Sequence, residues 1–147
     1  MSKYHEPVLL NESVDGLNID SKGVYVDVTF GGGGHSRAIL SKLDGGHLYA
    51  FDQDDEALNN EIEDEGFTLI NANFRYLKNS LRMYGVKEVD GLLADLGVSS
   101  HQFDVADRGF SIRFESDLDM RMDQNAELDA YKVCLLYTSD AADESDR

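Results

Sequence analysis

The sequence predicts an α/β fold built on a doubly wound, parallel sheet. Stretches rich in β-branched and aromatic residues alternate along the chain with stretches whose apolar residues recur at helical spacing. Four consecutive glycines directly follow the first strand-like stretch, "VYVDVTF". Parallel strands require crossover connections, which are usually helices, so this alternation favours a parallel sheet over an antiparallel one.

The first three elements are predicted to be a strand, a glycine loop and a helix. The strand covers residues 24–30 and runs into Gly31–Gly34. In residues 35–43, "HSRAILSKL", Ser36 is the expected helix cap, and apolar residues continue at helical spacing until Asp44–Gly46 ends the helix.

Three further strands are expected to complete the predicted sheet. They are "HLYAFDQDD" from His47, "FTLINANF" and "VDGLLADLGVSS". An acidic helix over about 54–65 and a helix from Phe74 to Gly85 are expected to connect them. From Ser99 onward no clear strand or long helix is predicted, which indicates a long functional loop. Four strands that end at an unpaired edge make an incomplete sheet, so we expect the chain to stop before its fold does.

Composition limits the class of protein. The chain has 147 residues, with 41% hydrophobic content, which predicts one globular domain. No long apolar segment follows the polar N-terminus, so we expect a cytoplasmic protein without signal peptide or membrane contact. Cys134 is the only cysteine, and the histidines show no metal-ligand spacing, so no metal is expected. The net charge of −16 argues against a nucleic-acid partner, because phosphate binding needs clustered bases.

The residues around the glycines discriminate between their candidate ligands. No lysine follows them, which excludes the phosphate loop of nucleotide triphosphatases. The dinucleotide pattern Gly-x-Gly-x-x-Gly/Ala nearly fits, but Ser36 stands at its last position, so an NAD-type oxidoreductase is the second choice. A tight turn that serves only packing is a further alternative.

Two acids favour a positively charged cofactor. Asp52, at the end of the second strand, is where a carboxylate accepts hydrogen bonds from ribose hydroxyls, although it could also be a solvated strand end or a helix cap. Asp27, just before the glycines, would repel the phosphates of a dinucleotide. S-adenosylmethionine, which carries a sulfonium and an amino group, suits such an acidic pocket better.

Several motifs together resemble one family. "HEPVLLNESV", "DVTFGGGGHSRAIL", "FDQD", "NANF", "DGLLADLGVSSHQFD", "RGFS" and "LDMRMD" occur in that order over about residues 5–133. In these motifs the chain resembles the bacterial small-subunit (16S) ribosomal RNA cytosine-N4 methyltransferases, the RsmH or MraW family. The last three motifs are the most specific. The resemblance implies a Rossmann-like methyltransferase sheet and N4-methylation of a cytidine in 16S ribosomal RNA within the small ribosomal subunit.

The same resemblance implies where S-adenosylmethionine binds. The expected cofactor-binding residues are Gly33, Gly34, His35, Asp52, Phe74, Asp95 and Gln102. Asp95 is also the candidate catalytic residue, since a doubly wound fold presents such groups at the carboxyl ends of its strands, although a role in cofactor binding alone is the alternative. Phe74 could cover the adenine ring or pack on its helix.

The resemblance ends after Val133. Residues 1–133 are therefore expected to be the N-terminal part of a methyltransferase domain, and 134–147, "CLLYTSDAADESDR", a foreign tail similar to translated sequencing-adapter sequence. We expect the chain alone to be inactive, so a non-catalytic cofactor-binding module is a third hypothesis. Arg108, Arg113 and Arg121 are candidates for RNA or lid contacts, or for ion pairs with Asp107, Glu115 and Asp119.

Overall fold

The computed structural model describes residues 7–136, which divide at Gly97 into two compact units. The first unit carries the sheet, and the second begins at Val98. Each unit is described by itself. The expected foreign tail falls mainly on residues 137–147, which lie outside the described residues, while 134–136 continue a helix that begins at residue 130.

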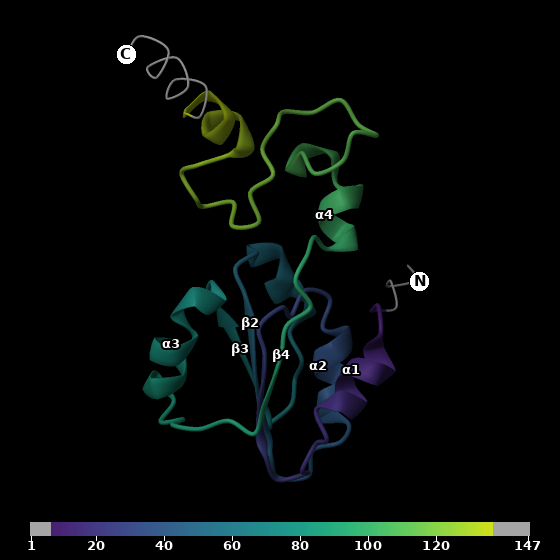
Figure 1. Ribbon diagram of the computed structural model, residues 1–147, viewed down its shortest axis with the longest axis vertical. Coiled ribbons are helices and arrows are strands. Elements are labelled where there is room, and N and C mark those ends of the chain that lie inside the picture. Colours follow the sequence, from purple (N-terminus) through teal and green to yellow (C-terminus); the bar gives the residue numbers. More distant parts are fainter. Residues whose placement is uncertain (1–6, 137–147) are drawn as a thin grey trace, which may run out of the picture. The chain divides into compact units, whose positions relative to one another are not determined.

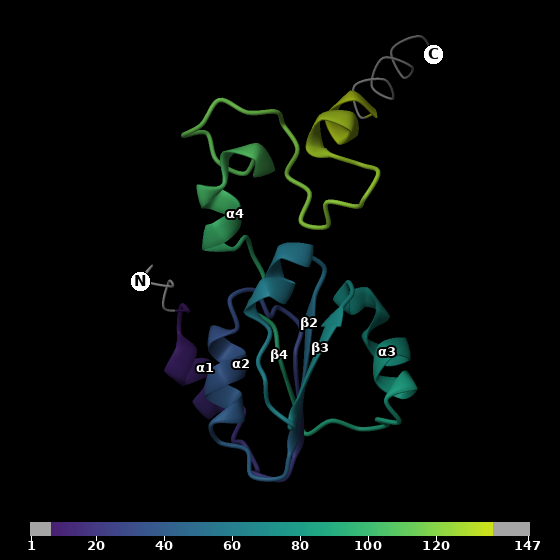
Figure 2. The same cartoon turned by 180° about the vertical axis from the view of Figure 1, so that it is seen from behind.

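The first unit contains a four-stranded parallel sheet, which confirms the predicted fold class. Its strands are β1 (Val24–Asp27), β2 (His47–Asp52), β3 (Phe67–Asn71) and β4 (Gly91–Leu93), in the order β3-β2-β1-β4. Helices α1 (Leu10–Gly16) and α2 (Gly34–Leu40) cover one face, and α3 (Leu77–Met83) stands on the other (Figures 1 and 2). The sheet is therefore doubly wound.

Alternate residues of the central strands supply two separate cores. In β2, Leu48 and Ala50 join the cluster that holds Ile39 of α2, whereas Tyr49 and Phe51 join the cluster that holds Leu81 of α3. Successive side chains of a strand point to opposite faces, so a strand covered by helices on both sides must be apolar at every position. This requirement explains the unbroken apolar runs of β1 and β2.

The strands stop earlier than predicted. β1 ends at Asp27 rather than at residue 30, because the Asp27 carboxylate accepts a hydrogen bond from the backbone N–H of Thr29 at 3.0 Å and turns the chain out of the sheet. β4 covers only 91–93 of the predicted 89–100. The residues that follow both strands are thereby released from the sheet and can form a site.

The predicted cap of the helix after the glycines was wrong. α2 begins at Gly34, and its N-cap is Gly33. Ser36 lies inside the helix, fully buried, and its hydroxyl donates a hydrogen bond to Asp27 at 2.8 Å. A hydroxyl that reaches a tertiary partner is unavailable for capping, and its partner lies nine residues away in the chain.

The predicted acidic helix over 54–65 was also wrong in type and length. Only a 3₁₀ segment, η1 (Asp55–Asn60), forms there, and Asp54 caps it by accepting a hydrogen bond from Glu56 N at 3.1 Å. The segment 54–65 holds seven acidic residues and no basic one. Like charges three and four positions apart destabilise an α-helix, so apolar spacing alone could not extend it.

Two helical elements differ from the remaining predictions. The helix expected from Phe74 starts as a 3₁₀ turn, η2 (Phe74–Tyr76), continues as α3 and ends before Gly85, whose φ of 77° requires glycine. Helix α1 was not predicted. It packs against α2 and buries Val14.

The second unit is a long loop between short helices, as predicted in outline. Helix α4 (Ser100–Asp104) begins with a capping box between Ser99 and Gln102, and η3 (Ala106–Arg108) follows. Residues 109–129 contain no helix or strand, and residues 130–136 are helical. Several of its apolar residues, including Ile112, Leu128 and Tyr131, are exposed.

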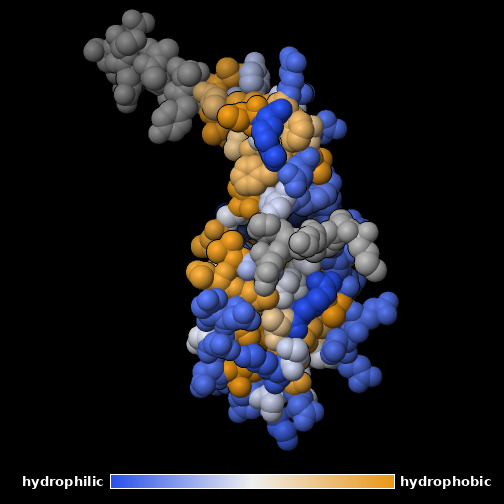
Figure 3. Space-filling view, turned by 90° about the vertical axis from the view of Figure 1, so that its right-hand side faces the viewer, coloured by the Kyte–Doolittle hydropathy of each residue, from blue (hydrophilic) through white to orange (hydrophobic). Residues whose placement is uncertain are grey.

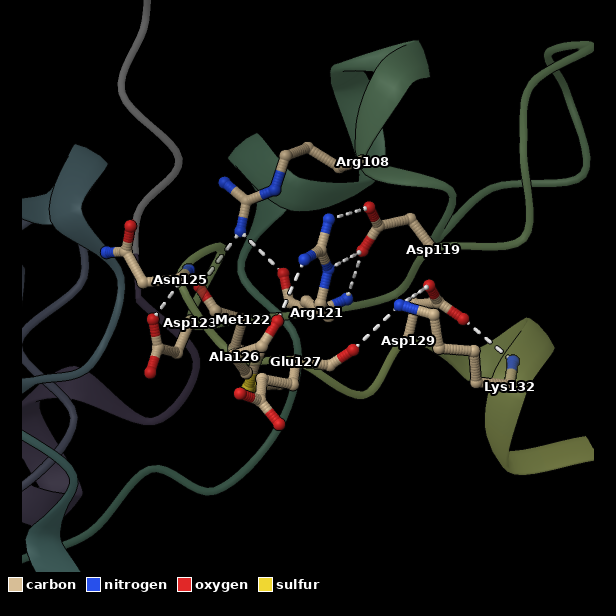
Figure 4. A network of polar contacts seen from close by, with 10 residues as sticks. All are labelled: Arg108, Asp119, Arg121, Met122, Asp123, Asn125, Ala126, Glu127, Asp129 and Lys132. Carbon is tan, nitrogen blue, oxygen red and sulfur yellow. Dashed lines mark hydrogen bonds and ion pairs between the residues drawn. The ribbon is translucent and has the colours of Figure 1, made fainter. Parts of the chain in front are cut away.

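Two arginines of the second unit, Arg108 and Arg121, make their contacts with residues of the loop itself (Figure 4). Arg121 pairs with Asp119 at 2.7 Å, as one alternative predicted. The other two expected ion pairs were wrong, because Arg113 pairs with Asp104 and the buried Arg108 donates to the backbone carbonyls of Arg121 and Met122, both at 3.1 Å. The loop is therefore organised around Arg108.

The side of the first unit that bears α1 is mostly hydrophilic, with hydrophobic residues interspersed (Figure 3). Among the described residues, no helix is long and apolar enough to cross a membrane.

Candidate functional site

The strand order places the switch point of the sheet at the carboxyl ends of β1 and β4, and we call this position the crevice. The chain leaves β1 through α2 toward β2 on one side, while β4 pairs with β1 on the other side. In open parallel sheets, ligands bind where the connections from adjacent strands diverge in this way. The segments that leave the sheet there are the glycine loop, which follows β1, and the residues around Asp95, which follow β4.

The glycine loop is shaped by contacts with its own surroundings. Gly33 has a φ of 76°, and a Cβ atom there would lie 2.6 Å from Arg37 Nη1 and 3.0 Å from the Phe30 ring. A Cβ atom on Gly34 would collide with the Pro7 ring. At Gly31, with a φ of 50°, a Cβ atom would meet nothing within 4 Å. Gly33 and Gly34 are thus required by packing, whereas Gly31 faces open space.

Two side chains that the sequence analysis did not single out hold the carbonyl groups of this loop. Arg37 Nη1 donates to Gly32 O at 2.7 Å, and its Nη2 donates to Asn60 O at 3.1 Å. Asn60 Nδ2 in turn donates to Gly31 O at 3.1 Å. Arg37 therefore ties α2, the loop and η1 together. An arginine one turn into the helix was the available signal, but its partners become visible only in three dimensions.

Asp52 stands at the end of β2 and faces the same loop. Its Oδ2 accepts from Gly31 N at 2.7 Å, and its Oδ1 accepts from Asp54 N at 2.9 Å. Burial raises the pKa of this carboxyl above its ordinary value of 3.8, while these backbone hydrogen bonds oppose the rise. The backbone N–H of Gln53 also donates to this carboxyl. A carboxylate offers about four lone-pair positions, so it can still accept a hydrogen bond from a ligand.

Asp27 begins a relay of hydrogen bonds between β1 and β4. The carboxyl is fully buried and accepts from the Ser36 hydroxyl at 2.8 Å and from the Thr29 hydroxyl at 3.3 Å. The Thr29 oxygen also accepts from the backbone N–H of Asp95 at 2.8 Å. Burial raises the pKa of Asp27, and the hydrogen bonds from Thr29 and Ser36 act in the opposite direction. Thr29 thereby connects the predicted catalytic position to the start of the glycine loop.

His35 lies beneath the same crevice. Its side chain is buried, and its Nδ1 lies 4.0 Å from Asp95 Oδ2. Its Nε2 is buried and has no hydrogen-bond partner among residues 7–136. Since buried polar atoms are nearly always satisfied, this ring nitrogen marks a place where a ligand or ordered water would bind.

Phe74 and Gln102 differ in their surroundings. Phe74, the first residue of η2 after β3, is 45% exposed, whereas Leu81 on the same predicted helix face is buried. Packing on the helix therefore does not account for Phe74, which leaves its ring available to a ligand. Gln102 belongs to the second unit, where it is buried and its side-chain oxygen accepts from Ser99 N at 3.1 Å.

The chemistry of the first-unit site is that of an acidic crevice. Four carboxyl groups, those of Asp27, Asp52, Asp54 and Asp95, come from the ends of β1, β2 and β4. Arg37 directs its guanidinium donors at backbone carbonyls. No group of three or more His, Cys, Asp or Glu side chains within 7–136 is arranged to hold a metal ion. Such a crevice favours a cationic ligand with several hydrogen-bond donors.

Comparison with known proteins assigns the chain to a family. The model of the MraW methylase family matches residues 2–142. The chain belongs to the MraW methylase family. It is 65% identical over 134 residues to the ribosomal RNA small subunit methyltransferase H of Christiangramia forsetii, and 62% identical over 135 residues to that of Phocaeicola vulgatus. These alignments cover 90% and 91% of this chain, but 44% of each relative, so the chain spans less than half the length of these curated relatives.

Two solved structures match at lower sequence identity. A putative methyltransferase of an antibiotic biosynthesis pathway from Anabaena variabilis matches with a TM-score of 0.47 and 20% identity, over 68% of this chain and 37% of that one. An rRNA methylase from Streptococcus thermophilus matches with a TM-score of 0.43 and 27% identity, over 53% and 51% of the two chains.

Proposed function

We propose that this chain forms the S-adenosylmethionine-binding part of a ribosomal RNA methyltransferase. The observation that carries the proposal is the acidic crevice at the carboxyl ends of β1 and β4. Beside it, at the end of β2, Asp52 holds the glycine loop and keeps an acceptor position open. The family membership and the names of the relatives support the reaction class.

The residues present fit this cofactor. The ribose hydroxyls of S-adenosylmethionine would donate to Asp52, and the exposed ring of Phe74 would cover the adenine. The unpartnered His35 Nε2 offers a hydrogen bond to a polar group of the ligand. The positive sulfonium and amino groups are favoured by the surrounding carboxylates. An NAD-type dinucleotide would place two phosphates close to Asp27, and the resulting repulsion disfavours the oxidoreductase hypothesis.

The proposed reaction transfers a methyl group to the exocyclic amine of a cytosine. The amine nitrogen forms a bond to the methyl carbon as the carbon–sulfur bond breaks, and the nitrogen then loses a proton. The lone pair of this amine is delocalised into the ring, so a group that accepts a hydrogen bond from the amine assists the attack. Asp95 is suited to this role because its side chain is 56% exposed while its backbone is held by Thr29.

The names of the relatives support a ribosomal RNA substrate. We propose N4 of a cytidine in 16S ribosomal RNA as the methylated atom, the small ribosomal subunit as the partner and the cytoplasm as the location. Gln102 is proposed to contribute to the same cofactor site. We also propose that residues 134–147 take no part in it, so truncation after Val133 should leave cofactor affinity unchanged.

Calorimetry with S-adenosylmethionine and with NAD tests the cofactor. Binding of S-adenosylmethionine without NAD binding is expected, and the reverse result would overturn the proposal. Transfer of a labelled methyl group to unmethylated small ribosomal subunits tests the reaction, with the 147-residue chain and a protein of the relatives' full length compared in parallel. Cofactor binding without methyl transfer by either protein would favour the non-catalytic binding module.

A further inference from the structure

Four basic residues gather on and beside α3 in a chain that is otherwise strongly acidic. No Asp or Glu occurs between Glu65 and Glu88, and the bases in this interval are Arg75, Lys78, Arg82 and Lys87. The interval therefore carries a charge of +4, whereas the whole chain carries −16. We call these four residues the α3 basic patch.

The α3 basic patch is exposed and is not neutralised by the protein. All four side chains are exposed. Across the described part of the chain, none of the four forms an ion pair, whereas Lys42, Arg113, Arg121 and Lys132 all do. Bases that served only the stability of an acidic protein would be expected to lie beside its acids. Their segregation points to an external anion.

Geometry brings the basic side chains together. Lys78 and Arg82 lie four positions apart on one side of a helix, and with Lys87 they line a single shallow groove between α3 and the segment that leads to β4. The floor of the groove is apolar and includes Leu77 and Val86. One acid, Glu88, also lines the groove, so its lining residues carry a net charge of +2. This net positive charge forms a local field that an extended polyanion can follow.

An aromatic residue stands at the end of α3 nearest the crevice. Tyr76 is 53% exposed, and the Arg75 guanidinium carbon lies 5.5 Å from the centre of its ring. η2, which contains both residues, directly follows the carboxyl end of β3, the same edge of the sheet that bears Asp52. An exposed aromatic ring beside bases is the arrangement on which unpaired nucleotides stack.

We propose that the α3 basic patch, with Tyr76, is a surface that binds the sugar–phosphate backbone of single-stranded RNA. An acidic protein segment could bind to the cations alone and would not need the exposed ring. The presence of both unpaired cations and an exposed ring therefore favours RNA as the ligand. The inference rests on the proposed function for the identity of the nucleic acid as ribosomal. It also explains how a chain of charge −16 can approach RNA, since the approach needs only a local positive surface.

Fluorescence anisotropy of a labelled single-stranded RNA, transcribed from a 16S ribosomal RNA segment, tests the proposal with the full 147-residue chain. The variant K78Q/R82Q/K87Q should bind this RNA at least about 10-fold more weakly at low salt. The slope of log affinity against log salt should fall in magnitude by about 2, as expected for three lost phosphate contacts on a single strand. Tyr76→Ala should weaken binding with little change in the salt slope, because a ring carries no charge.

A matched control separates local from overall charge. The variant K22Q/K42Q/K132Q changes the net charge by the same amount at three bases outside the α3 basic patch and should change RNA affinity less than about 2-fold. K78R/R82K/K87R should bind like the unmodified chain. Circular dichroism melting should show that all three variants fold, because their substitutions lie on exposed side chains.

The outcomes distinguish this inference from the proposed function. The inference would be overturned if the two Gln variants bound RNA with equal affinity. It would also be overturned if the unmodified chain did not bind RNA, or if it bound polyglutamate in place of RNA. Calorimetry with S-adenosylmethionine is run on the same variants and should give an unchanged affinity. The chain could bind RNA through the α3 basic patch and yet fail to bind S-adenosylmethionine. That result would support the inference and contradict the proposed function.

Discussion

The backbone N–H of Asp95 donates a 2.8 Å hydrogen bond to the hydroxyl of Thr29, 66 residues earlier in the chain. The same hydroxyl donates to the buried carboxyl of Asp27 at 3.3 Å. One small side chain thus links the ends of β1 and β4 at the point where the connections from the two strands diverge. Thr29 is a positioning residue in the proposed reaction, because it acts through Asp95.

Thr29→Val should separate this positioning role from the overall fold. Valine keeps the shape of threonine but loses both hydrogen bonds, so the free energy of unfolding should fall by about 1 kcal/mol, and affinity for S-adenosylmethionine should also fall. Thr29→Ser retains the hydroxyl and should restore affinity. Denaturant unfolding and calorimetry measure the two effects. Equal cofactor affinity in Val and Ser variants would show that Thr29 does not position Asp95.

The two glycines with positive φ in the loop should respond differently to alanine. Gly33→Ala places a Cβ atom 3.0 Å from the Phe30 ring and displaces Arg37 Nη1 from its hydrogen bond with Gly32 O. It should therefore lower stability more than Gly31→Ala, which meets only the backbone penalty of about 1–2 kcal/mol. Gly31→Ala should instead weaken cofactor binding, because its Cβ atom would point into open space beside Asp52. Thermal unfolding should show the larger loss of stability in Gly33→Ala, and calorimetry should show the larger loss of cofactor affinity in Gly31→Ala. If Gly33→Ala caused the larger loss both of stability and of cofactor affinity, the loop would serve packing alone.

The sequence predicted the features that depend on local periodicity. The βαβ arrangement and the place of Asp52 at a strand end follow from apolar runs and from the glycines, which are read within a few residues. The acidic segment 54–65 shows the limit of this method, because apolar spacing favoured a helix and the repulsion among seven acids opposed it.

The features that depend on distant partners could not be predicted. The bond from Asp95 to Thr29 requires the register between β1 and β4, which no spacing in the sequence encodes. Arg108 lies beside Asp107 in the sequence, and an ion pair between them was one of the two alternatives considered. Its guanidinium instead reaches backbone carbonyls 13 and 14 residues further along the chain. Pairing between neighbours in sequence is a weak guide where a loop folds back on itself.

The Asp119–Arg121 pair should stabilise the second unit in a pH-dependent way. Hydrogen bonds from the Arg121 side chain lower the pKa of Asp119 from 3.8 to about 2. Because the folded pKa is depressed, the stabilisation is fully present above pH 3.8 and is lost as the pH falls toward 2. Asp119→Asn should reduce protection from hydrogen exchange over residues 108–130 at neutral pH, by about 1 kcal/mol.

Asp104→Asn provides the comparison for this pair. It removes the ion pair with Arg113, whose side chains are 62% and 70% exposed, and surface pairs of this kind contribute little. Protection over residues 108–130 should therefore change much less than in Asp119→Asn. Equal loss in the two variants would mean that Asp119 does not organise the loop.

Asp52 should give cofactor affinity and protein stability opposite dependences on pH. Burial raises the pKa of Asp52 above 3.8, so its ionised form is disfavoured in the folded chain, and this group contributes rising stability as the pH falls from neutral through the raised pKa. Affinity for S-adenosylmethionine should fall over the same interval, because protonation removes an acceptor for the ribose hydroxyls. Asp52→Ala should weaken binding by about 1.5–3 kcal/mol at neutral pH, and Asp52→Asn should bind weakly with a flatter pH profile. Calorimetry and denaturant unfolding between about pH 4 and pH 7.5, upward from the ordinary carboxyl value, measure both trends. An unchanged affinity of Asp52→Ala would remove Asp52 from the cofactor site and leave it the structural role of holding Gly31 N.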